Sequence, residues 1–588
     1  MPSLDGLSVE LLSEILRLIH DSSRQTIFSL LRVNRAISEA ALPFVYRECT
    51  FDFSQRSLHS SDRRPTLETP YQRSLEKLAS LLKLYPIPDS AIWRGVRKVV
   101  VRSDWVVWEG NSNMYRSEGP PFIPSEELVR AKWGSFIEFL SRVVYLREVV
   151  FDCLERVPII LLNTLKKHPA CRLHVRNWTR LGCGVKVGDP YEEALARSPC
   201  LRSIEARFVT GGPQMDLNQA AFERILAMSP NLETISYTTR SAGGCVIYPI
   251  TPARLAETEK EREELAVAHP VRKSSLKNIQ WGGLSPGLLR RWGSFIKLSN
   301  VESLDLGGIG DTALMNYVRE HGTFSGLKHL SFQISHYPRN ASVTAEEFKS
   351  ALEDFLSYTC PLLQSLSIVD CNSHIDIDLS PILLRHGETL RSLAFHQLEH
   401  TGGARSILTR EELTLVREKA PHLERFELDV NRTMYPGSKE SEYYSVLASF
   451  PNLRHLAIYL DLGIHYKAFQ SNGSSQTKAD KREADRFRQI YTEIDEEFAR
   501  EVWRAVRGKE LEEMVLYDGE PSRDIGFGYP AGWVLREQRD RQQFVVKRNE
   551  RDDLKDNVAA ATATHRGRAR QMLPPMISVP SFLSNLNQ

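Results

Sequence analysis

The chain has 588 residues, 41% of them hydrophobic, and its 76 Lys and Arg against 74 Asp and Glu leave a net charge of +2. This apolar content is enough for a large core, and the length exceeds that of one ordinary globular domain. The near-neutral balance excludes a global electrostatic attraction to nucleic acid or to anionic membranes, so neither is expected as a partner.

The eight cysteines are scattered and include no C-x-x-C pair. This usage favours reduced thiols in a cytoplasmic or nuclear protein. The stretch from Met1 to Leu12 is amphipathic and acidic, which is not typical of a signal peptide. No run of about 18 or more apolar residues predicts a membrane span.

Residues 1–50 have the pattern of three short helices. Ser8 is a suitable N-cap for the first, and Gln25 to Val33 fits the second. Asn34 opens the third helix, which is predicted to stop before Pro43. Three helices of this length make a thin core, so some apolar side chains are expected to stay exposed as a docking surface.

Residues 51–92 are predicted to form a linker and a connecting helix, because Ser54 to Thr69 is polar and charged. Residues 93–518 carry a repeated phrase of the form apolar-x-x-apolar-x-apolar, with neighbouring copies often 25 to 36 residues apart. The copies begin at Val96, Leu146, Leu201, Leu232, Leu276, Val301, Leu327, Leu363, Leu390, Leu423, Leu453 and Leu511.

Each phrase has the spacing of a short strand, because its last two apolar positions are two residues apart. A helical pattern that ends at a Pro precedes several copies, as in Asp216 to Met228 before Pro230 and Thr409 to Lys419 before Pro421. No unit can bury its apolar face alone, but stacked units can. The sequence therefore predicts an α/β repeat array.

Three insertions interrupt the array. Ser103 to Pro124 contains Trp105 and Trp108, which suit either a recognition loop or a cap over the first repeat. Thr238 to Lys273 includes a charged run that is typical of a solvated helix, and Asp461 to Ala505 is the third insertion. Residues 519–588 are expected to be a mostly disordered tail.

Catalytic motifs are missing from this sequence. It has no G-x-S-x-G, no P-loop and no H-E-x-x-H, and its His and Cys residues do not cluster at metal-ligand spacing. We therefore predict a protein that is not an enzyme and has no catalytic residues, metal or cofactor. A deep pocket lined by convergent titratable groups would instead indicate an enzyme.

The N-terminal segment resembles an F-box. Leu7-Ser8-Val9-Glu10-Leu11-Leu12, followed by Ile15-Leu16, looks like the opening phrase of that family, and Leu30 to Arg35 with Ala41 to Arg47 is similar to its second half. Ser8 occupies the usual Pro position, where it can cap the helix but loses the Pro contact with the adaptor. The resemblance implies that adaptor contact and internal packing are divided among Leu7, Ser8, Leu11, Leu12, Ile15, Leu16, Leu30, Leu31, Val33 and Leu42.

The remainder resembles a degenerate leucine-rich repeat array. The Asn or Cys that completes this family's phrase occurs only at Asn431 and Cys371, so the array is expected to be irregular. The expected architecture is α/β, with a three-helix F-box, a horseshoe with a parallel concave sheet and convex helices, and a disordered tail.

The combined resemblance implies the substrate-recognition subunit of a cullin–RING ubiquitin ligase. Its partners would be a Skp-type adaptor, the cullin ligase core and a protein substrate of unknown identity. The alternative, motivated by Ser8, is a non-catalytic repeat scaffold that binds a protein partner without recruiting a ligase.

Substrate contact is expected from residues that lie between the apolar positions of the phrase, because they point to the opposite, concave face of the sheet. The alternative is a sheet face that is merely solvated. The candidates are Asp305, Gln333, His396, Glu427, Asp429 and Tyr459.

Overall fold

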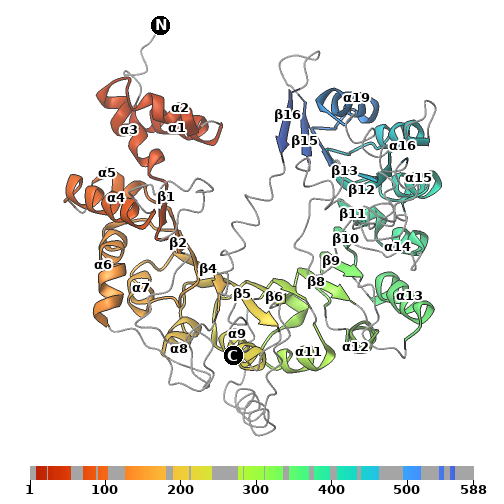
Figure 1. Ribbon diagram of the computed structural model, residues 1–588, viewed down its shortest axis with the longest axis horizontal. Helices are drawn as coiled ribbons and strands as arrows, with labels where there is room; N and C mark the ends of the chain where they lie inside the picture. The colour runs from red at the N-terminus through yellow and green to blue at the C-terminus, as the bar shows by residue number, and fades with distance from the viewer. Residues whose placement is uncertain are drawn as a thin grey trace, which may run out of the picture. The chain divides into compact units, whose positions relative to one another are not determined.

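Figure 1 shows the computed structural model of the chain. It divides into two compact units, residues 1–279 with 290–297, and residues 280–289 with 298–588. The structure describes residues 8–22, 24–54, 70–87, 90–103, 126–179, 190–210, 214–241, 276–282, 284–309, 312–322, 324–334, 343–359, 361–369, 377–397, 407–432, 439–461, 482, 494–517, 542–548 and 557–562.

The first unit begins with three helices, α1 (Val9–Ser22), α2 (Arg24–Leu30) and α3 (Arg35–Val45). The Asn34 side chain caps α3 by accepting a 2.8 Å hydrogen bond from the backbone N–H of Ile37, as its position in the sequence predicts. The expected stop before Pro43 is wrong, because α3 continues to Val45. Phe44 and Val45 pack against the core of this helical module, and that packing favours the extra turn despite the proline.

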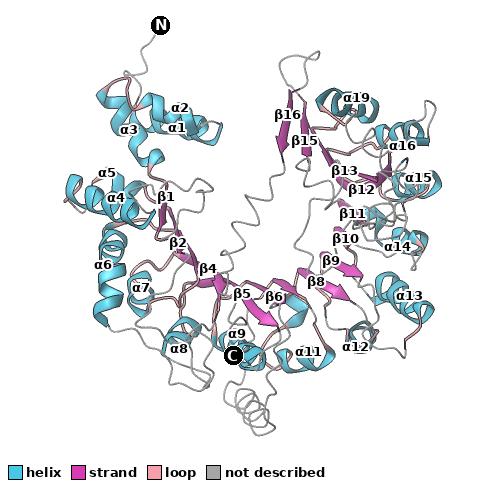
Figure 2. Cartoon of the chain, viewed as in Figure 1, coloured by secondary structure: helices cyan, strands magenta, loops and turns pink. Residues whose placement is uncertain are grey.

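In the described part of the first unit, six parallel strands follow in chain order, each bonded to the next. Helices connect them and lie along one side of the strands in Figures 1 and 2. The strands are β1 (Glu48–Asp52), β2 (Lys98–Ser103), β3 (Glu148–Cys153), β4 (Arg172–Trp178), β5 (Leu201–Thr210) and β6 (Thr234–Ser241). The helices are α4 (Pro70–Leu84), α5 (Ala91–Gly95), α6 (Glu126–Arg142), α7 (Ile159–Leu165), α8 (Pro190–Ala196) and α9 (Gln214–Met228).

The sheet starts earlier in the chain than the sequence predicts. Strand β1 lies at the junction of the expected F-box and linker, and Phe51 of β1 pairs with Val101 of β2. The side chains of Phe51 and Phe53 are fully buried, with ring centroids 5.0 to 6.0 Å from aromatic rings of α6. This aromatic burial holds the first strand in the sheet. Residues 51–54 therefore belong to the folded sheet rather than to a linker.

The second unit repeats the arrangement, and its helices again lie along one side of parallel strands (Figure 2). Its strands are β8 (Ser303–Ile309), β9 (His329–Ile334), β10 (Ser365–Val369), β11 (Ser392–His396), β12 (Arg425–Asn431), β13 (His455–Asp461) and β14 (Glu513–Tyr517). Its helices are α12 (Ala313–His321), α13 (Ala345–Asp354), α14 (Leu379–His386), α15 (Arg410–Lys419), α16 (Lys439–Ala448) and α19 (Glu496–Val506). A π-helical turn at Phe355–Thr359 follows α13, and short 3-10 turns lie at Leu298–Asn300 and Gly387–Thr389. Two elements, β7 (Asn278–Trp281) and α11 (Pro286–Trp292), contain two of the points where the chain passes between the units, and a third lies between Lys297 and Leu298.

All twelve copies of the repeated phrase lie at strands, which confirms the α/β repeat reading of the phrase. Their apolar positions are buried throughout, as at Leu363, Leu366 and Ile368. Strands β1 and β4 were not predicted. In β4, Leu173 and Val175 keep the strand spacing and are buried, but the leading position of the phrase is Ala170, which is exposed. Beyond the phrase, Asn177 adopts a φ of 59° and the register with β5 shifts.

The expected tail contains two described strands, which corrects the expectation of disorder for those residues. Strand β15 (Gln542–Lys547) pairs antiparallel with β14, and β16 (Asn557–Thr562) pairs antiparallel with β15. Phe544 and Val546 of β15 are buried. The hairpin covers the edge that β14 would otherwise leave unpaired.

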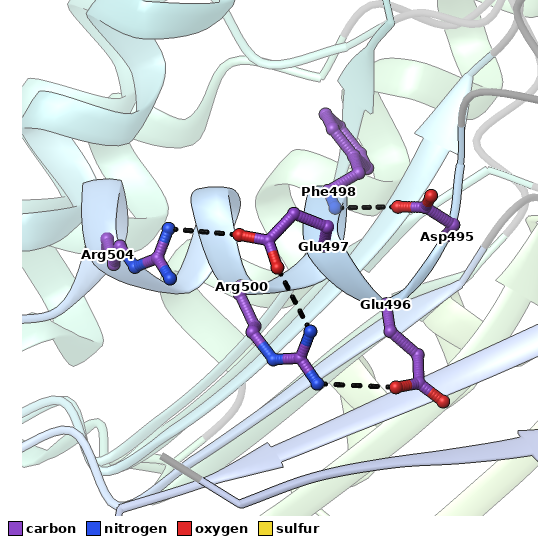
Figure 3. A network of polar contacts seen from close by, with 6 residues as sticks. All are labelled: Asp495, Glu496, Glu497, Phe498, Arg500 and Arg504. Atoms are coloured by element: carbon purple, nitrogen blue, oxygen red, sulfur yellow. Dashed lines mark hydrogen bonds and ion pairs between the residues drawn. The ribbon is translucent and has the colours of Figure 1, made fainter. Parts of the chain in front are cut away.

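Helix α19 has one apolar face that is buried and one charged face toward solvent. Ala499, Val502 and Trp503 are buried against the unit. On the solvent side, Glu497 pairs with Arg500 at 3.0 Å and with Arg504 at 3.3 Å (Figure 3). Asp495 caps the helix by accepting a 2.9 Å hydrogen bond from the N–H of Phe498.

The described parts of the chain include no helix that is both long enough and apolar enough to cross a bilayer. The aromatic insertion at 104–125, most of the insertion at 242–275 and most of the third insertion, 462–481 and 483–493, lie outside the described residues.

Candidate interaction surfaces

The ten predicted adaptor-binding residues belong to the helical module of the first unit, which consists of α1, α2 and α3 with the residues that flank them. They differ in how deeply they are buried. Leu12 and Leu16 form its core with Ile27 and Ala41. Partly buried apolar side chains pack against this core. Leu7 lies outside the described residues. The residues of intermediate exposure are Ile15, Leu30, Leu31 and Leu42.

Large apolar side chains remain on the surface of this module. Leu11 is 57% exposed and Val33 is 59% exposed, in agreement with the predicted surface. Leu18 at 58% and Phe28 at 48% belong to the same class but were not among the predicted contacts. The signal for Leu18 was present in the sequence. Residues seven positions apart on a helix share one face, and Leu18 is seven positions after Leu11.

Ser8 caps α1 as the sequence predicts. Its backbone carbonyl accepts a 2.9 Å bond from the N–H of Leu12, and its hydroxyl lies 3.4 Å from the N–H of Leu11. The helix therefore forms without a proline at this position.

The helical module is joined closely to the first repeats. A Cβ atom added to Gly95 of α5 would lie 2.5 Å from the Cα of Pro43 in α3, so only glycine fits between these backbones. Two residues after α3, the carbonyl of Arg47 accepts 2.9 Å bonds from the N–H groups of Arg97 and Lys98. The module and the sheet thus meet through backbone contacts.

In the second unit, four of the six predicted substrate residues share one row across neighbouring strands. Gln333 pairs with Val369, and Val369 pairs with His396. Asp429 pairs with Tyr459, and Tyr459 pairs with Tyr517. The row of facing residues is Gln333, Val369, His396, Asp429, Tyr459 and Tyr517.

The centre of this row is a buried polar pair. The Nδ1 atom of His396 lies 2.9 Å from Oδ1 of Asp429, and Oδ2 of Asp429 accepts a 2.6 Å bond from the N–H of Gln397. His396 is only 5% exposed and Asp429 only 3%. Both residues were expected to contact a substrate. The structure corrects this expectation, because the two side chains are buried and paired with each other. Their role is to shape the row.

Two tyrosines extend the row. The ring of Tyr459 stacks on His396 with 3.7 Å between centroids, and Tyr517 stacks on Tyr459 at 4.5 Å. Three rings therefore stand side by side on β11, β13 and β14. Both tyrosines are partly exposed, so they are the members of this row that a partner can reach.

Asp305 and Glu427 lie in the adjacent row, which continues through Ser331, Ser367 and Ala394. Asp305 accepts a 2.9 Å hydrogen bond from the N–H of Gly307, which has a φ of 57° beside a register shift in β8. This bond makes Asp305 part of a local turn. Glu427 is exposed and remains a candidate for partner contact.

The first unit carries an arrangement of charges on the sheet that sequence reasoning missed. Lys98 pairs with Glu148 at 3.1 Å, and Arg102 lies 3.9 Å from Asp152. These pairs belong to two rows in which the sign of the charge alternates from strand to strand. One row is Glu48, Lys98, Glu148 and Arg172, and the other is Asp52, Arg102, Asp152 and Arg176.

A shared spacing produces these rows. Glu48 and Asp52, Lys98 and Arg102, and Glu148 and Asp152 are each four residues apart, so each pair points to one face of its strand. Only the register shows that opposite charges become neighbours, because the strands are distant in sequence.

Chemistry at these surfaces is limited by the groups present. Burial raises the pKa of Cys171 to about 12 and holds the pKa of Cys153 well above its usual value, so these thiols stay neutral and are poor nucleophiles. Among the residues that the structure describes, no His, Cys, Asp and Glu side chains group as a metal site would require. Among the described residues, those lining a surface depression on α15 are Arg410, Glu411, Thr414, Leu415 and Glu418, all from that helix.

Comparison of the chain with protein-family models and with curated proteins gives no match in either case.

Proposed function

We propose that this protein is a substrate receptor of a cullin–RING ubiquitin ligase. The helical module, an F-box, docks on a Skp-type adaptor, and the repeat array, a degenerate leucine-rich repeat horseshoe, holds a protein substrate. The protein transfers no group itself. Its contribution is to bring the substrate to the ligase core.

The observation that carries this proposal is the exposure of apolar side chains on a module with a complete core. Leu11 and Leu18 protrude from α1, and Phe28 and Val33 lie on α2 and the turn after it, while Leu12 and Leu16 are buried beneath. A module that leaves four large apolar side chains in water loses hydrophobic free energy, which a protein partner restores. A few such anchors are sufficient for useful affinity.

The close attachment of the helical module to the first repeats supports the same proposal. The contact of Gly95 with Pro43 and the backbone bonds of Arg47 fix the helices to the first repeats. A rigid connection keeps a constant geometry between an adaptor bound at the helices and a partner bound at the adjacent sheet, which a substrate receptor requires.

The test is binding of the full chain to purified Skp-type adaptor. The variant Leu11→Asp, Val33→Asp places charges on the exposed side chains, and binding should fall by roughly tenfold or more because buried anchors are lost. The matched control is Leu384→Asp, an exposed apolar residue of α14 in the second unit, which should bind as the wild type does. Leu12→Asp is unsuitable, since it would disrupt the core rather than the surface.

The second candidate is a scaffold that binds a partner without recruiting a ligase. The observation in its favour is Ser8, which caps α1 but offers no proline to the adaptor. If the folded wild-type chain does not bind the adaptor, and Ser8→Pro restores binding, the scaffold is correct and the receptor proposal is wrong.

A further inference from the structure

Three arginines occupy equivalent positions immediately before the first three repeat strands. The N–H of Arg97 donates to the carbonyl of Arg47 at 2.9 Å, and the N–H of Arg147 donates to the carbonyl of Arg97 at 2.8 Å. Neighbouring strands are about 4.8 Å apart, so the three backbones follow one another over about 10 Å. Like charges on adjacent strands are destabilising, and this row is therefore unfavourable to folding.

The positive charges of this row are not neutralised by described carboxylates. The structure gives no ion pair to Arg47, Arg97 or Arg147 within the described part of the chain. The Arg97 guanidinium donates instead to the backbone carbonyls of Arg94 and Val96. Partial burial, followed by the charges of Arg147 and Arg47, lowers the pKa of Arg97, as expected for crowded cations.

Exposed apolar side chains accompany the row. The Arg97 guanidinium lies 5.0 Å from the ring centroid of Tyr145, which is 51% exposed. Val144 next to it is 43% exposed. Arg47 and Arg147 are exposed as well, so a partner can reach both the charges and the apolar groups.

We propose that Arg47, Arg97 and Arg147, together with Tyr145, form a docking site for a carboxylate-rich segment of a partner protein that also carries apolar residues. Each guanidinium offers a planar fork that matches a carboxylate in two hydrogen bonds. The charges are distributed along a line rather than converging on one point, which suits several carboxylates of an extended segment better than one compact dianion. Tyr145 and Val144 contact the apolar residues that lie between the carboxylates of this segment.

The surrounding charges argue against a long polyanion. Glu48 and Glu148 directly follow Arg47 and Arg147, and the second row of alternating charges adds Asp52 and Asp152 on the same strands. A nucleic-acid backbone that ran on across this sheet would meet these carboxylates. The site does not depend on adaptor binding, so its failure would leave the proposed receptor function untouched.

The experiment measures binding of the full chain to a short fluorescein-labelled peptide of alternating Glu and Leu or Phe, by fluorescence anisotropy at low and high salt. The triple variant Arg47→Gln, Arg97→Gln, Arg147→Gln should weaken binding by roughly tenfold or more. The wild-type affinity should fall as salt rises. The matched control removes three exposed arginines elsewhere, Arg290→Gln, Arg385→Gln, Arg425→Gln, and should change affinity less than about twofold.

Folding and competing ligands are checked in the same assay. The triple variant should melt at the wild-type temperature or above, because repulsion is removed, and Arg147→Gln alone provides a second variant at an exposed position. Absence of peptide binding, or equal weakening by the control variant, would overturn the proposal. Tighter arginine-dependent binding of a phosphoserine peptide or of single-stranded RNA would overturn the assignment to a carboxylate-rich segment.

Discussion

The imidazole of His396 and the carboxylate of Asp429 are joined by a 2.9 Å hydrogen bond between the neighbouring strands β11 and β12. Both groups are almost fully buried, and the second carboxylate oxygen binds the backbone N–H of Gln397. One carboxylate therefore organises the end of two strands, and the imidazole supports the stacked ring of Tyr459.

Replacing Asp429 tests this organisation. Asp429→Ala leaves the His396 ring and the Gln397 N–H without their acceptor, which should cost about 1–3 kcal/mol of unfolding free energy for each buried group left unsatisfied. The urea midpoint of the second unit should fall clearly. Glu427→Gln, two residues earlier and exposed, is the control and should leave that midpoint within error.

His386 makes the stability of the second unit depend on pH. Its Nδ1 accepts a 3.2 Å bond from the N–H of Leu363, so the proton is on Nε2, which lies 2.7 Å from the carbonyl of Leu356. Burial, the largest cause, and the charge of Arg385 lower the pKa of His386 below 6.5. Protonation of Nδ1 would break the bond to Leu363.

The unfolded chain takes up this proton near pH 6.5, whereas the folded protein resists it until a lower pH. The free energy of unfolding should therefore fall as pH falls below 6.5, by at most about 1.4 kcal/mol per pH unit for this one group. His168 and His174 of the first unit have lowered pKa values too, chiefly through burial, so the wild-type slope includes them. The difference between wild type and His386→Gln isolates His386, and identical slopes would contradict this prediction.

Gly95 should not tolerate a side chain. In Gly95→Ala the new Cβ would meet the Pro43 backbone, which cannot move as a flexible side chain can, and a loss of about 1–3 kcal/mol is expected. Faster hydrogen exchange in α3 would report loosening of the helical module. Gly134→Ala in α6 is the matched control, because no described atom beyond the nearby backbone of its own helix and its chain neighbours lies within 4 Å of the added Cβ. It should be neutral or stabilising by up to about 1 kcal/mol.

Four described cysteines should resist alkylation in the folded protein. Cys49, Cys153, Cys171 and Cys200 are all buried as free thiols. Burial raises the pKa of the last three, so little thiolate is present near pH 8. Mass-spectrometric mapping after iodoacetamide treatment should show these sites modified only in denaturant. Rapid modification of Cys171 in the native protein would contradict its burial.

The regular spacing of the repeated phrase determined how much of the fold could be predicted from the sequence. At Leu363, Leu366 and Ile368, as in the other copies of the phrase, the spacing alone places the buried face of a strand, because the strand period is local information. Strand β4 was not predicted because the leading position of its phrase is the small, exposed Ala170 rather than a buried Leu or Val. The segment of β1 carries strand spacing in Cys49, Phe51 and Phe53, so this signal was present in the sequence. The aromatic rings of distant α6 show what buries Phe51 and Phe53.

The sequence by itself determined the units: which residues turn inward, where helices are capped by residues such as Asn34, and which N-terminal residues are apolar enough to dock. These properties depend on neighbours a few positions away. Only the tertiary structure decided which residues meet across strands. It buried His396 against Asp429, separated Leu11 from Leu12, and placed Arg47, Arg97 and Arg147 side by side. The burial of Leu12 and the exposure of Leu11 depend on packing of α1 against the other helices of the module. The cross-strand contacts join residues that are distant in the chain, and strand register, which no local pattern carries, sets them.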